Sequence, residues 1–257
     1  MEITLENTRI AHAFRKSLNT YDQAATVQHR MARDLVDELK KHGPRQFDRV
    51  LELGCGTGQL TRMMLSAFFI EHYAANDLVP ECETGIDAIF ARYPKTKGSF
   101  LAGDAETFYD YPDALSLLVS GATFQWLDDL NGFLARITPY LAPEGILAFS
   151  TFGPDNCKEI RTLTGLGLDY PTLDKLKGYL KKDYHILAVR ESHETCFFDT
   201  PMAVLRHLKA TGVNGIAAHR WTPKGLAQFC ENYTMAYQQG AGVPLTYHPV
   251  LIVARKK

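Results

Sequence analysis

A short glycine-rich turn follows the first strongly apolar run of the chain. Val50–Leu53 has the composition of a buried strand, and Gln59–Phe69 has the apolar spacing of a helix. A turn of this kind lets a ligand approach bare backbone amides. Asp77 ends the next apolar stretch, where its carboxylate can accept hydrogen bonds from both hydroxyls of a ribose. The pattern therefore predicts a nucleoside site; the alternatives are a tight packing turn and, for Asp77, a helix cap.

The spacing of the glycines separates two kinds of nucleoside site. The dinucleotide fingerprint G-x-G-x-x-G would place its third glycine at the position that Gln59 occupies. The glycines instead form the pattern E-x-G-x-G-x-G, which begins at Glu52. That pattern resembles the S-adenosylmethionine loop of class I methyltransferases. The cofactor has no phosphates, so the resemblance implies that the loop faces its amino acid moiety. We expect Glu52 to act indirectly, by holding the loop or a group of the cofactor.

Two further strand ends carry polar or small side chains. Asp104 and Ala105 follow the third predicted strand, and we expect them to meet the adenine amino group, although Asp104 is also suited to cap a helix. Ser120–Trp126 follows the fourth strand. Within it, Gln125 and Trp126 are candidates for the wall where the methyl group and the acceptor meet. The alternative is that Trp126 fills the core.

These residues need an α/β scaffold to bring them together. Residues 8–41 have helical periodicity with a break at 17–20, and strand-like and helical segments then alternate. The expected strands are 50–53, 72–76, 99–102, 115–119 and 145–151, and the helices between them are 59–69, 81–93 and 127–141. Repeated strand–helix units imply a doubly wound, mostly parallel sheet. The resemblance to class I methyltransferases implies that this sheet is Rossmann-like and has seven strands. In such a sheet ligands bind at the carboxyl ends of the strands.

The second half of the chain departs from this alternation. Residues 155–182 have helical character interrupted by glycine and proline, and we expect a helical insertion lying over the active site. One or two strands follow at 185–198, helices at 201–211 and 222–238, and a terminal strand at 245–254. We see no linker, so residues 1–257 are predicted to form a single domain, with 8–41 as an N-terminal helical lid.

Composition excludes several classes of protein. The formal net charge of −1 and pI near 6.8 provide no global field for nucleic acid. Five scattered cysteines form no C-x-x-C pair and no zinc spacing, so we expect reduced thiols, no metal and a cytoplasmic location. The acidic N-terminus lacks the apolar core of a signal peptide, and the apolar runs are too short to span a membrane.

Several segments outside the glycine loop resemble one particular family. Tyr21–Gln28 is similar to the N-terminal Y-D-x-x-A-x-x-Q segment of malonyl-acyl-carrier-protein O-methyltransferases of biotin synthesis. Ser120–Trp126 is similar to that family's S-x-x-x-x-Q-W stretch, Phe149–Asp155 to its fifth strand and exit turn, and Leu205–Asn214 to its L-[RK]-x-L-K-x-x-G-x-N segment. The likeness extends over nearly the whole chain, but 155–182 and the run Glu81–Glu83 depart from it.

The resemblance implies methyl transfer from S-adenosylmethionine to the free carboxylate of a malonyl thioester, on acyl carrier protein or coenzyme A. A carboxylate is already ionised at pH 7, so no general base is required. We expect Tyr21 to close over the cofactor near its methyl group or methionine moiety. We expect Arg206 to hold the acceptor carboxylate bidentately, with support from Lys209. Lys177, Lys181, Lys182 and Lys209 are candidates for docking an acidic carrier.

Other functions remain open from the sequence. The nearest alternative is a methyltransferase for a quinone precursor or another small acid, and a different class is a cofactor-binding protein without catalysis. No Asn-Pro-Pro-Tyr run follows the fourth strand to hold a flipped base, which disfavours nucleic acid as the acceptor. The predicted cofactor ligands are Tyr21, Glu52, Gly54, Cys55, Gly56, Gly58, Asp77, Leu78, Asp104, Ala105 and Ser120; the predicted catalytic residues are Tyr21, Gln125, Trp126 and Arg206.

Overall fold

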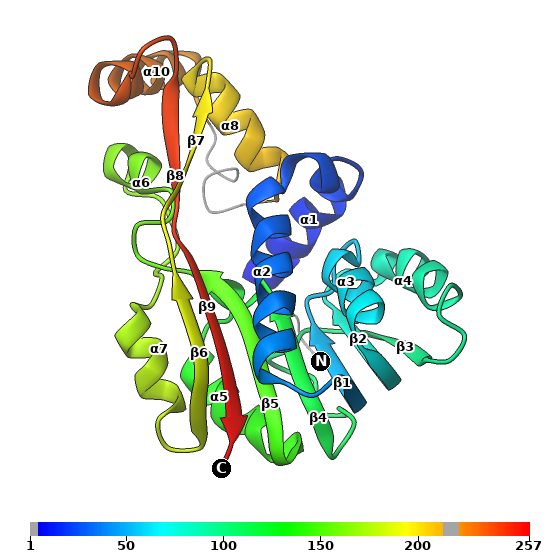
Figure 1. Ribbon diagram of the computed structural model, residues 1–257. Helices are drawn as coiled ribbons and strands as arrows, with labels where there is room; N and C mark the ends of the chain where they lie inside the picture. The colour runs from blue at the N-terminus through cyan, green and yellow to red at the C-terminus, as the bar shows by residue number, and fades with distance from the viewer. Residues whose placement is uncertain (1–4, 213–220) are drawn as a thin grey trace.

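A seven-stranded sheet forms the centre of the computed structural model, which describes residues 5–212 and 221–257. The strand order is β3-β2-β1-β4-β5-β9-β6; β9 pairs antiparallel with both β5 and β6, and the other pairs of this sheet are parallel (Figure 1). The strands are β1 (Gln46–Leu53), β2 (Phe69–Asp77), β3 (Lys97–Ala102), β4 (Leu115–Gly121), β5 (Leu141–Phe152), β6 (Tyr184–Glu191) and β9 (Pro249–Lys256). The predicted doubly wound, mostly parallel α/β sheet is therefore confirmed.

Helices cover both faces of this sheet, because its central strands are apolar on both sides. One face packs against α2 (Thr26–His42), α3 (Gln59–Ala67) and α4 (Glu83–Phe90). The other face packs against α5 (Leu130–Ile137) and α7 (Leu173–Leu180). Short 3-10 turns η1 (Pro80–Cys82), η2 (Phe124–Trp126) and η3 (Thr138–Tyr140) complete the connections.

A smaller layer extends beyond the carboxyl ends of the strands. The antiparallel pair β7 (Glu194–Phe198) and β8 (Val243–Tyr247) packs with α6 (Lys158–Thr164), α8 (Pro201–Ala210) and α10 (Pro223–Tyr237) around a third apolar cluster. We call this layer the platform; Figure 1 shows it above the main sheet. The terminal strand expected at 245–254 is therefore two strands, separated at His248 and belonging to different sheets.

The junction between sheet and platform is tied by polar contacts. His248 lies between β8 and β9, and its imidazole stacks on His193 with ring centroids 4.1 Å apart. The His193 Nε2 atom lies 2.9 Å from Asp155 Oδ2, and His248 Nε2 lies 3.0 Å from Glu191 Oε1. The Asp155 backbone N–H donates to His248 Nδ1, so His248 carries its proton on Nε2. These contacts connect the ends of β5, β6 and β8. The spacing of these residues in the sequence did not predict this connection.

Two helical predictions need correction. The break in the N-terminal helices falls at Ala25, between α1 (Leu5–Ala24) and α2, and not at 17–20. The segment 155–182 does not lie over the active site as expected: α6 packs in the platform, and α7 packs on the sheet against α5 and β6. The glycine and proline residues of segment 155–182 separate two short helices that lie in different layers.

No helix among the described residues is long and apolar enough to cross a membrane.

Candidate active site

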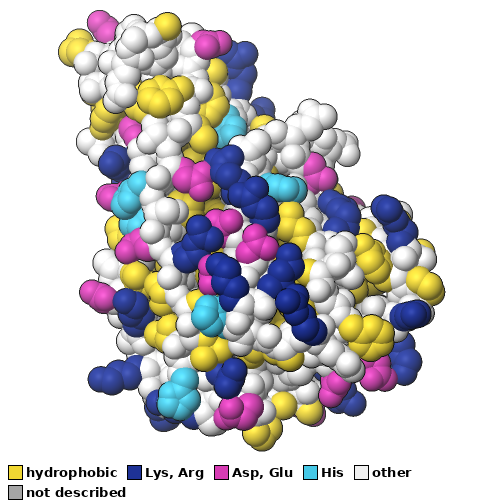
Figure 2. Space-filling view, in the orientation of Figure 1, with side chains coloured by type: hydrophobic (Ala, Val, Ile, Leu, Met, Phe, Trp, Pro, Cys, Tyr) yellow, Lys and Arg dark blue, Asp and Glu magenta, His cyan; other side chains and the backbone are white. Residues whose placement is uncertain are grey.

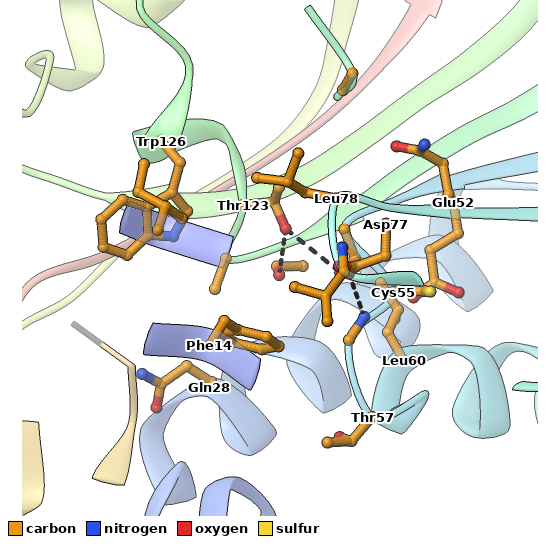
Figure 3. Close-up of a pocket in the computed structure, with 18 of the residues that line it drawn as sticks. Phe14, Gln28, Glu52, Cys55, Thr57, Leu60, Asp77, Leu78, Thr123 and Trp126 are labelled. Carbon is orange, nitrogen blue, oxygen red and sulfur yellow. Dashed lines mark hydrogen bonds between the residues drawn. The ribbon is translucent and has the colours of Figure 1, made fainter. Parts of the chain in front are cut away.

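A pocket opens where β1, β2, β3 and β4 end, at the edge of the sheet predicted for a ligand. Its lining combines the glycine loop, the ends of these strands, and side chains from α1 and α2 (Figure 3). Of the predicted residues, the structure places these in the lining: Tyr21, Glu52, Gly54, Cys55, Gly56, Asp77, Leu78, Asp104, Ala105 and Trp126. They come from five separate segments of the chain, so the fold brings them together.

The glycine loop has a backbone that other residues adopt only with strain. Gly54, Gly56 and Gly58 have φ angles of +70°, +51° and +77°. A Cβ atom on Gly54 would lie 2.1 Å from Thr123 Oγ1, and one on Gly58 would lie 2.3 Å from Ile89 Cδ1. Gly58 therefore serves the packing of α3 against α4 and lies outside the pocket lining, whereas Gly54 and Gly56 line it.

Asp77 is buried at the end of β2 and supports the loop directly. Its Oδ2 accepts the backbone N–H of Gly56 at 2.8 Å, and its Oδ1 accepts that of Val79 at 2.8 Å. Burial raises the pKa of Asp77, and these amide hydrogen bonds oppose the rise. Each carboxylate oxygen keeps a further lone pair, so the group can still accept hydrogen bonds from a ligand.

Glu52 is almost fully buried beneath the loop, and only half of its carboxylate is satisfied. Its Oε2 accepts hydrogen bonds from Thr61 Oγ1 at 2.6 Å and Tyr73 Oη at 2.8 Å. Its Oε1 has no partner among the described residues, although the residue lines the pocket. Burial raises the pKa of Glu52 to about 7. A buried acceptor without a donor calls for an explanation, and a cationic ligand group would provide one.

Helix α1 lies against the loop from the other side. Phe14 contacts Tyr21, with ring centroids 5.0 Å apart, and its ring would touch a Cβ atom on Gly56. Asp22 accepts hydrogen bonds from Thr57 Oγ1 at 2.6 Å and Gln59 Nε2 at 2.9 Å. Burial raises the pKa of Tyr21, so its hydroxyl stays protonated. These contacts place α1 where a lid would close, and the lid itself stays a prediction.

Two predicted residues after β4 instead have internal partners. Ser120 Oγ donates to the Leu53 carbonyl at 2.9 Å in the buried sheet. The Gln125 side chain donates to the Ala122 carbonyl and accepts from Thr151 Oγ1. Neither lines the pocket, whereas Trp126 does. Asp104 lines the pocket and also accepts the backbone N–H of Glu106 at 2.9 Å in a turn; no helix begins among the described residues between β3 and β4, so the helix-cap alternative is wrong.

Arg206 lies farther from the pocket than expected. It is on the exposed face of α8, and its Nε donates to the Met202 carbonyl at 3.3 Å. Neither Arg206 nor Lys209 is among the described lining residues. The last two residues of the family-like 205–214 segment, Val213 and Asn214, lie outside the described residues.

Sequence reasoning missed several residues of the pocket. Phe14, Gln28 and Thr123 line it, although none was predicted as a site residue. Gln28 had a signal, because it ends the family-like segment that begins at Tyr21. Thr123 lies within Ser120–Trp126, whose position after the fourth strand was a signal for the segment but not for this residue, and Phe14 had no signal beyond its helical spacing.

Comparisons with known proteins agree with this geometry. The chain matches the model of the methyltransferase domain family over residues 26–217 and belongs to that family. A putative methyltransferase from Bacillus halodurans has the same fold, with a TM-score of 0.62 at 14% identity over 86% of this chain and 98% of that one.

Curated relatives narrow the family. The chain is 40% identical to a malonyl-[acyl-carrier protein] O-methyltransferase of Chlorobium luteolum, over 96% of this chain and 95% of that protein. It is also 40% identical to the protein of the same name from Bacteroides thetaiotaomicron, over 98% of this chain and 99% of that one. The chain belongs to the malonyl-[acyl-carrier protein] O-methyltransferase family.

Proposed function

We propose that this chain transfers the methyl group of S-adenosylmethionine to the free carboxylate of a malonyl thioester on acyl carrier protein, an early step of biotin synthesis. The observation that supports it is the charge of the pocket. Its described lining contains Glu52, Asp77 and Asp104, and no lysine or arginine. Such a lining disfavours the phosphates of a dinucleotide and suits a cofactor with a sulfonium and an ammonium group.

The residues present fit that cofactor. Asp77 would accept hydrogen bonds from the ribose hydroxyls, with Leu78 beside the adenine, and Asp104 and Ala105 would face its amino group. The free Glu52 Oε1 would accept a hydrogen bond from the ammonium of the methionine moiety. When bound, the cofactor supplies a methyl group already activated by its positive sulfur. The chain contributes alignment and the exclusion of water, which can lower a barrier by roughly 7–11 kcal/mol.

We also propose roles for the two basic residues of α8. Arg206 and Lys209 are exposed on a helix that contacts α1, so they are placed to meet the carrier or its acyl arm. Lys181 and Lys182 are placed differently: Lys257 Nζ donates to both of their carbonyls, beside the start of β6 and the end of β9. Figure 1 shows that these residues lie at the other end of the sheet from the carboxyl ends of β1, β2 and β4, where the pocket-lining residues are, so we propose that Lys181 and Lys182 take no part in docking.

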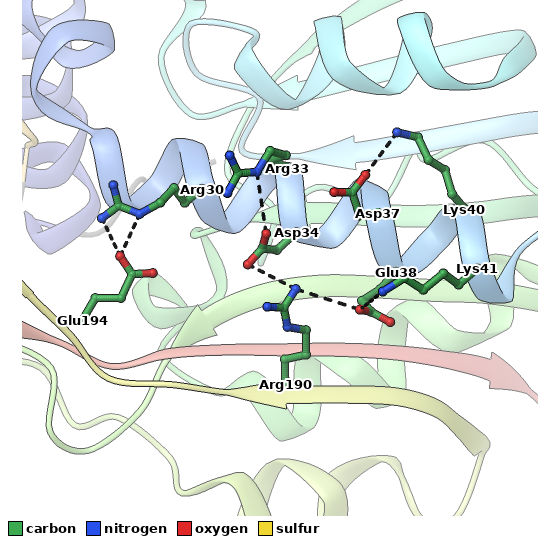
Figure 4. A network of polar contacts seen from close by, with 9 residues as sticks. All are labelled: Arg30, Arg33, Asp34, Asp37, Glu38, Lys40, Lys41, Arg190 and Glu194. Atoms are coloured by element: carbon green, nitrogen blue, oxygen red, sulfur yellow. Dashed lines mark hydrogen bonds and ion pairs between the residues drawn. The ribbon is translucent and has the colours of Figure 1, made fainter.

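The lysine and arginine side chains that cluster on the surface over α2 form ion pairs with acidic side chains. Figure 2 shows lysines and arginines there interleaved with Asp and Glu. Figure 4 shows the pairs: Arg190 with Asp34 at 3.2 Å, Lys40 with Asp37 at 3.1 Å, Lys41 with Glu38 at 2.8 Å, and Arg30 with Glu194. We propose that this surface serves neither nucleic acid nor membrane, because its positive field is largely cancelled.

We propose a cytoplasmic site of action.

The experiment that tests the function offers labelled S-adenosylmethionine with malonyl carrier, malonyl coenzyme A, free diacids and a quinone-like phenol. Base-labile label on the malonyl carrier is the expected result, and malonyl coenzyme A is the competing acceptor. Label on the phenol alone would refute the proposal. An Arg206→Ala variant should methylate the malonyl carrier more slowly at limiting substrate while keeping cofactor affinity; equal activity would remove Arg206 from the carrier-docking surface.

A further inference from the structure

Gln28 carries a side-chain amide that lines the pocket and has no hydrogen-bond partner in the described part of the protein. It lies in the first half of α2 with 9% of its surface exposed, and it lines the pocket. No hydrogen bond to its side chain is found among residues 5–212 and 221–257. An amide offers two donors and one acceptor, and here these groups belong to a residue that lines the pocket, where a bound ligand can pair with them. A partner for Gln28 is therefore expected from a ligand.

Its place in the pocket indicates which ligand. Figure 3 shows Gln28 and Trp126 at the end away from Asp77 and Glu52. The indole N–H of Trp126 also has no partner among the described residues. Glu52 and Asp77, which suit a cationic cofactor, are therefore at one end, and two uncharged side chains without partners in the described residues are at the other. This second end suits an anion that approaches the methyl group.

We propose that Gln28 is a specificity-determining residue that donates a hydrogen bond to the acceptor's carboxylate and selects acids over neutral acceptors. This inference rests on the proposed function. The carboxylate oxygen not held by Gln28 forms the new C–O bond while the bond between sulfur and the methyl carbon breaks. The electron pair of the broken sulfur–carbon bond stays on sulfur. The products are a methyl ester and a neutral thioether, and no proton moves.

The neutrality of Gln28 suits this reaction. Negative charge on the acceptor and positive charge on sulfur both disappear as the methyl group moves. A cation placed on the carboxylate would stabilise the starting state more than the transition state, which slows the chemical step. A neutral amide fixes the orientation of the carboxylate with less of that penalty. The described lining, which holds uncharged donors and no lysine or arginine, has this character.

Two variants and one control test the role of Gln28. Gln28→Met keeps a similar volume and removes the hydrogen bonds, and Gln28→Glu adds a negative charge. Gln46→Met, at an exposed position at the start of β1, away from the carboxyl end where the pocket lies, is the matched control. We expect kcat/KM for malonyl carrier to fall about tenfold or more in Gln28→Met and about a hundredfold in Gln28→Glu. Cofactor affinity should stay within about twofold in Gln28→Met.

Calorimetry separates this inference from the proposed function. Malonyl-pantetheine is titrated into the complex of each protein with S-adenosylhomocysteine, and Gln28→Met should bind it about tenfold more weakly than the wild type. Wild-type binding that depends on Gln28 without methyl transfer would overturn the function and support the inference. Methyl transfer that is equal in wild type and Gln28→Met would overturn the inference alone. A parallel loss of cofactor affinity in Gln28→Met would place Gln28 on the cofactor and overturn it too. No binding and no transfer by the wild type would overturn both.

Discussion

The two ends of the pocket satisfy their polar groups in different ways. At the cofactor end, both Asp77 oxygens and one Glu52 oxygen are held by backbone or hydroxyl donors of the protein. At the acceptor end, the polar side chains of Gln28 and Trp126 have no partners in the described residues. The first end is organised before any ligand arrives, whereas the second depends on its ligand for completion. Variants at the first end should therefore reduce cofactor affinity, and variants at the second should affect acceptor use.

The largest loss of cofactor affinity is expected at Gly54, where the cofactor end of the pocket has no room for a side chain. A Cβ atom on Gly54 would overlap Thr123, and its φ of +70° is strained for alanine. Gly54→Ala should lower cofactor affinity by about a hundredfold or more, measured by calorimetry.

The control separates steric overlap from backbone strain. Gly165 has a similar φ of +68°, and a Cβ atom there would have nothing within 4 Å. Gly165→Ala should cost about 1 kcal/mol of stability and leave cofactor affinity unchanged. Equal cofactor affinity in the two variants would contradict a preorganised loop.

The next effect concerns the acid that supports the loop. Asp77 holds two backbone N–H groups, so Asp77→Ala would leave both unpaired and disturb the loop itself. Asp77→Asn keeps an acceptor and removes the charge, and cofactor affinity should fall by about tenfold or more. Asp110→Asn, at an exposed position, is the control. Unchanged affinity in Asp77→Asn would remove the carboxylate from the ribose.

How far the sequence predicts this site depends on how local each signal is. The glycine loop and Asp77 follow from neighbouring residues alone, because a strand end, a turn and a helix start are contiguous. Ser120 and Gln125 also follow a strand, yet Ser120 donates to the adjacent strand's Leu53 carbonyl and Gln125 to the Ala122 carbonyl. Only the pairing of β1 with β4 decides which hydroxyl faces inward.

The acceptor end is less predictable for the same reason. Gln28 interrupts the apolar face of α2, which by itself indicates no more than a helix boundary or a surface position. Its exposure to the pocket depends on how α2 packs against α3 and the sheet. The bend at His248 is likewise hidden in sequence, because the residues before and after it have the same strand-like composition.

A pH dependence separates the partly satisfied Glu52 from the satisfied Asp77. The native pKa of Glu52, about 7, is above its ordinary value of 4.5, so its contribution to stability is present below 4.5 and is lost as pH rises through 7. An ammonium group favours the ionised carboxylate. Cofactor affinity should therefore rise by about tenfold between pH 5.5 and 7.

Glu52→Gln isolates this carboxylate from other titrating groups. The variant should bind the cofactor more weakly, and the part of the pH dependence due to Glu52 should vanish. Its free form should also lose less stability than the wild type between pH 5 and 8, measured by denaturant unfolding. The same pH dependence of affinity in both proteins would mean that Glu52 only supports the loop through Thr61 and Tyr73.

The smallest effect is expected at the contact between α1 and the organised end. Asp22 is about half exposed, with 51% of its side chain accessible, so its hydrogen bonds to Thr57 and Gln59 are partly screened. If α1 is a lid, cofactor should slow amide exchange across residues 10–30, and Asp22→Asn should speed cofactor release by about two- to threefold. Asp37→Asn, which removes an exposed pair with Lys40 on α2, should leave the release rate unchanged. Identical exchange with and without cofactor would show that α1 is a fixed wall of the pocket, and the loop would then be shaped by packing with Phe14 and not by closure.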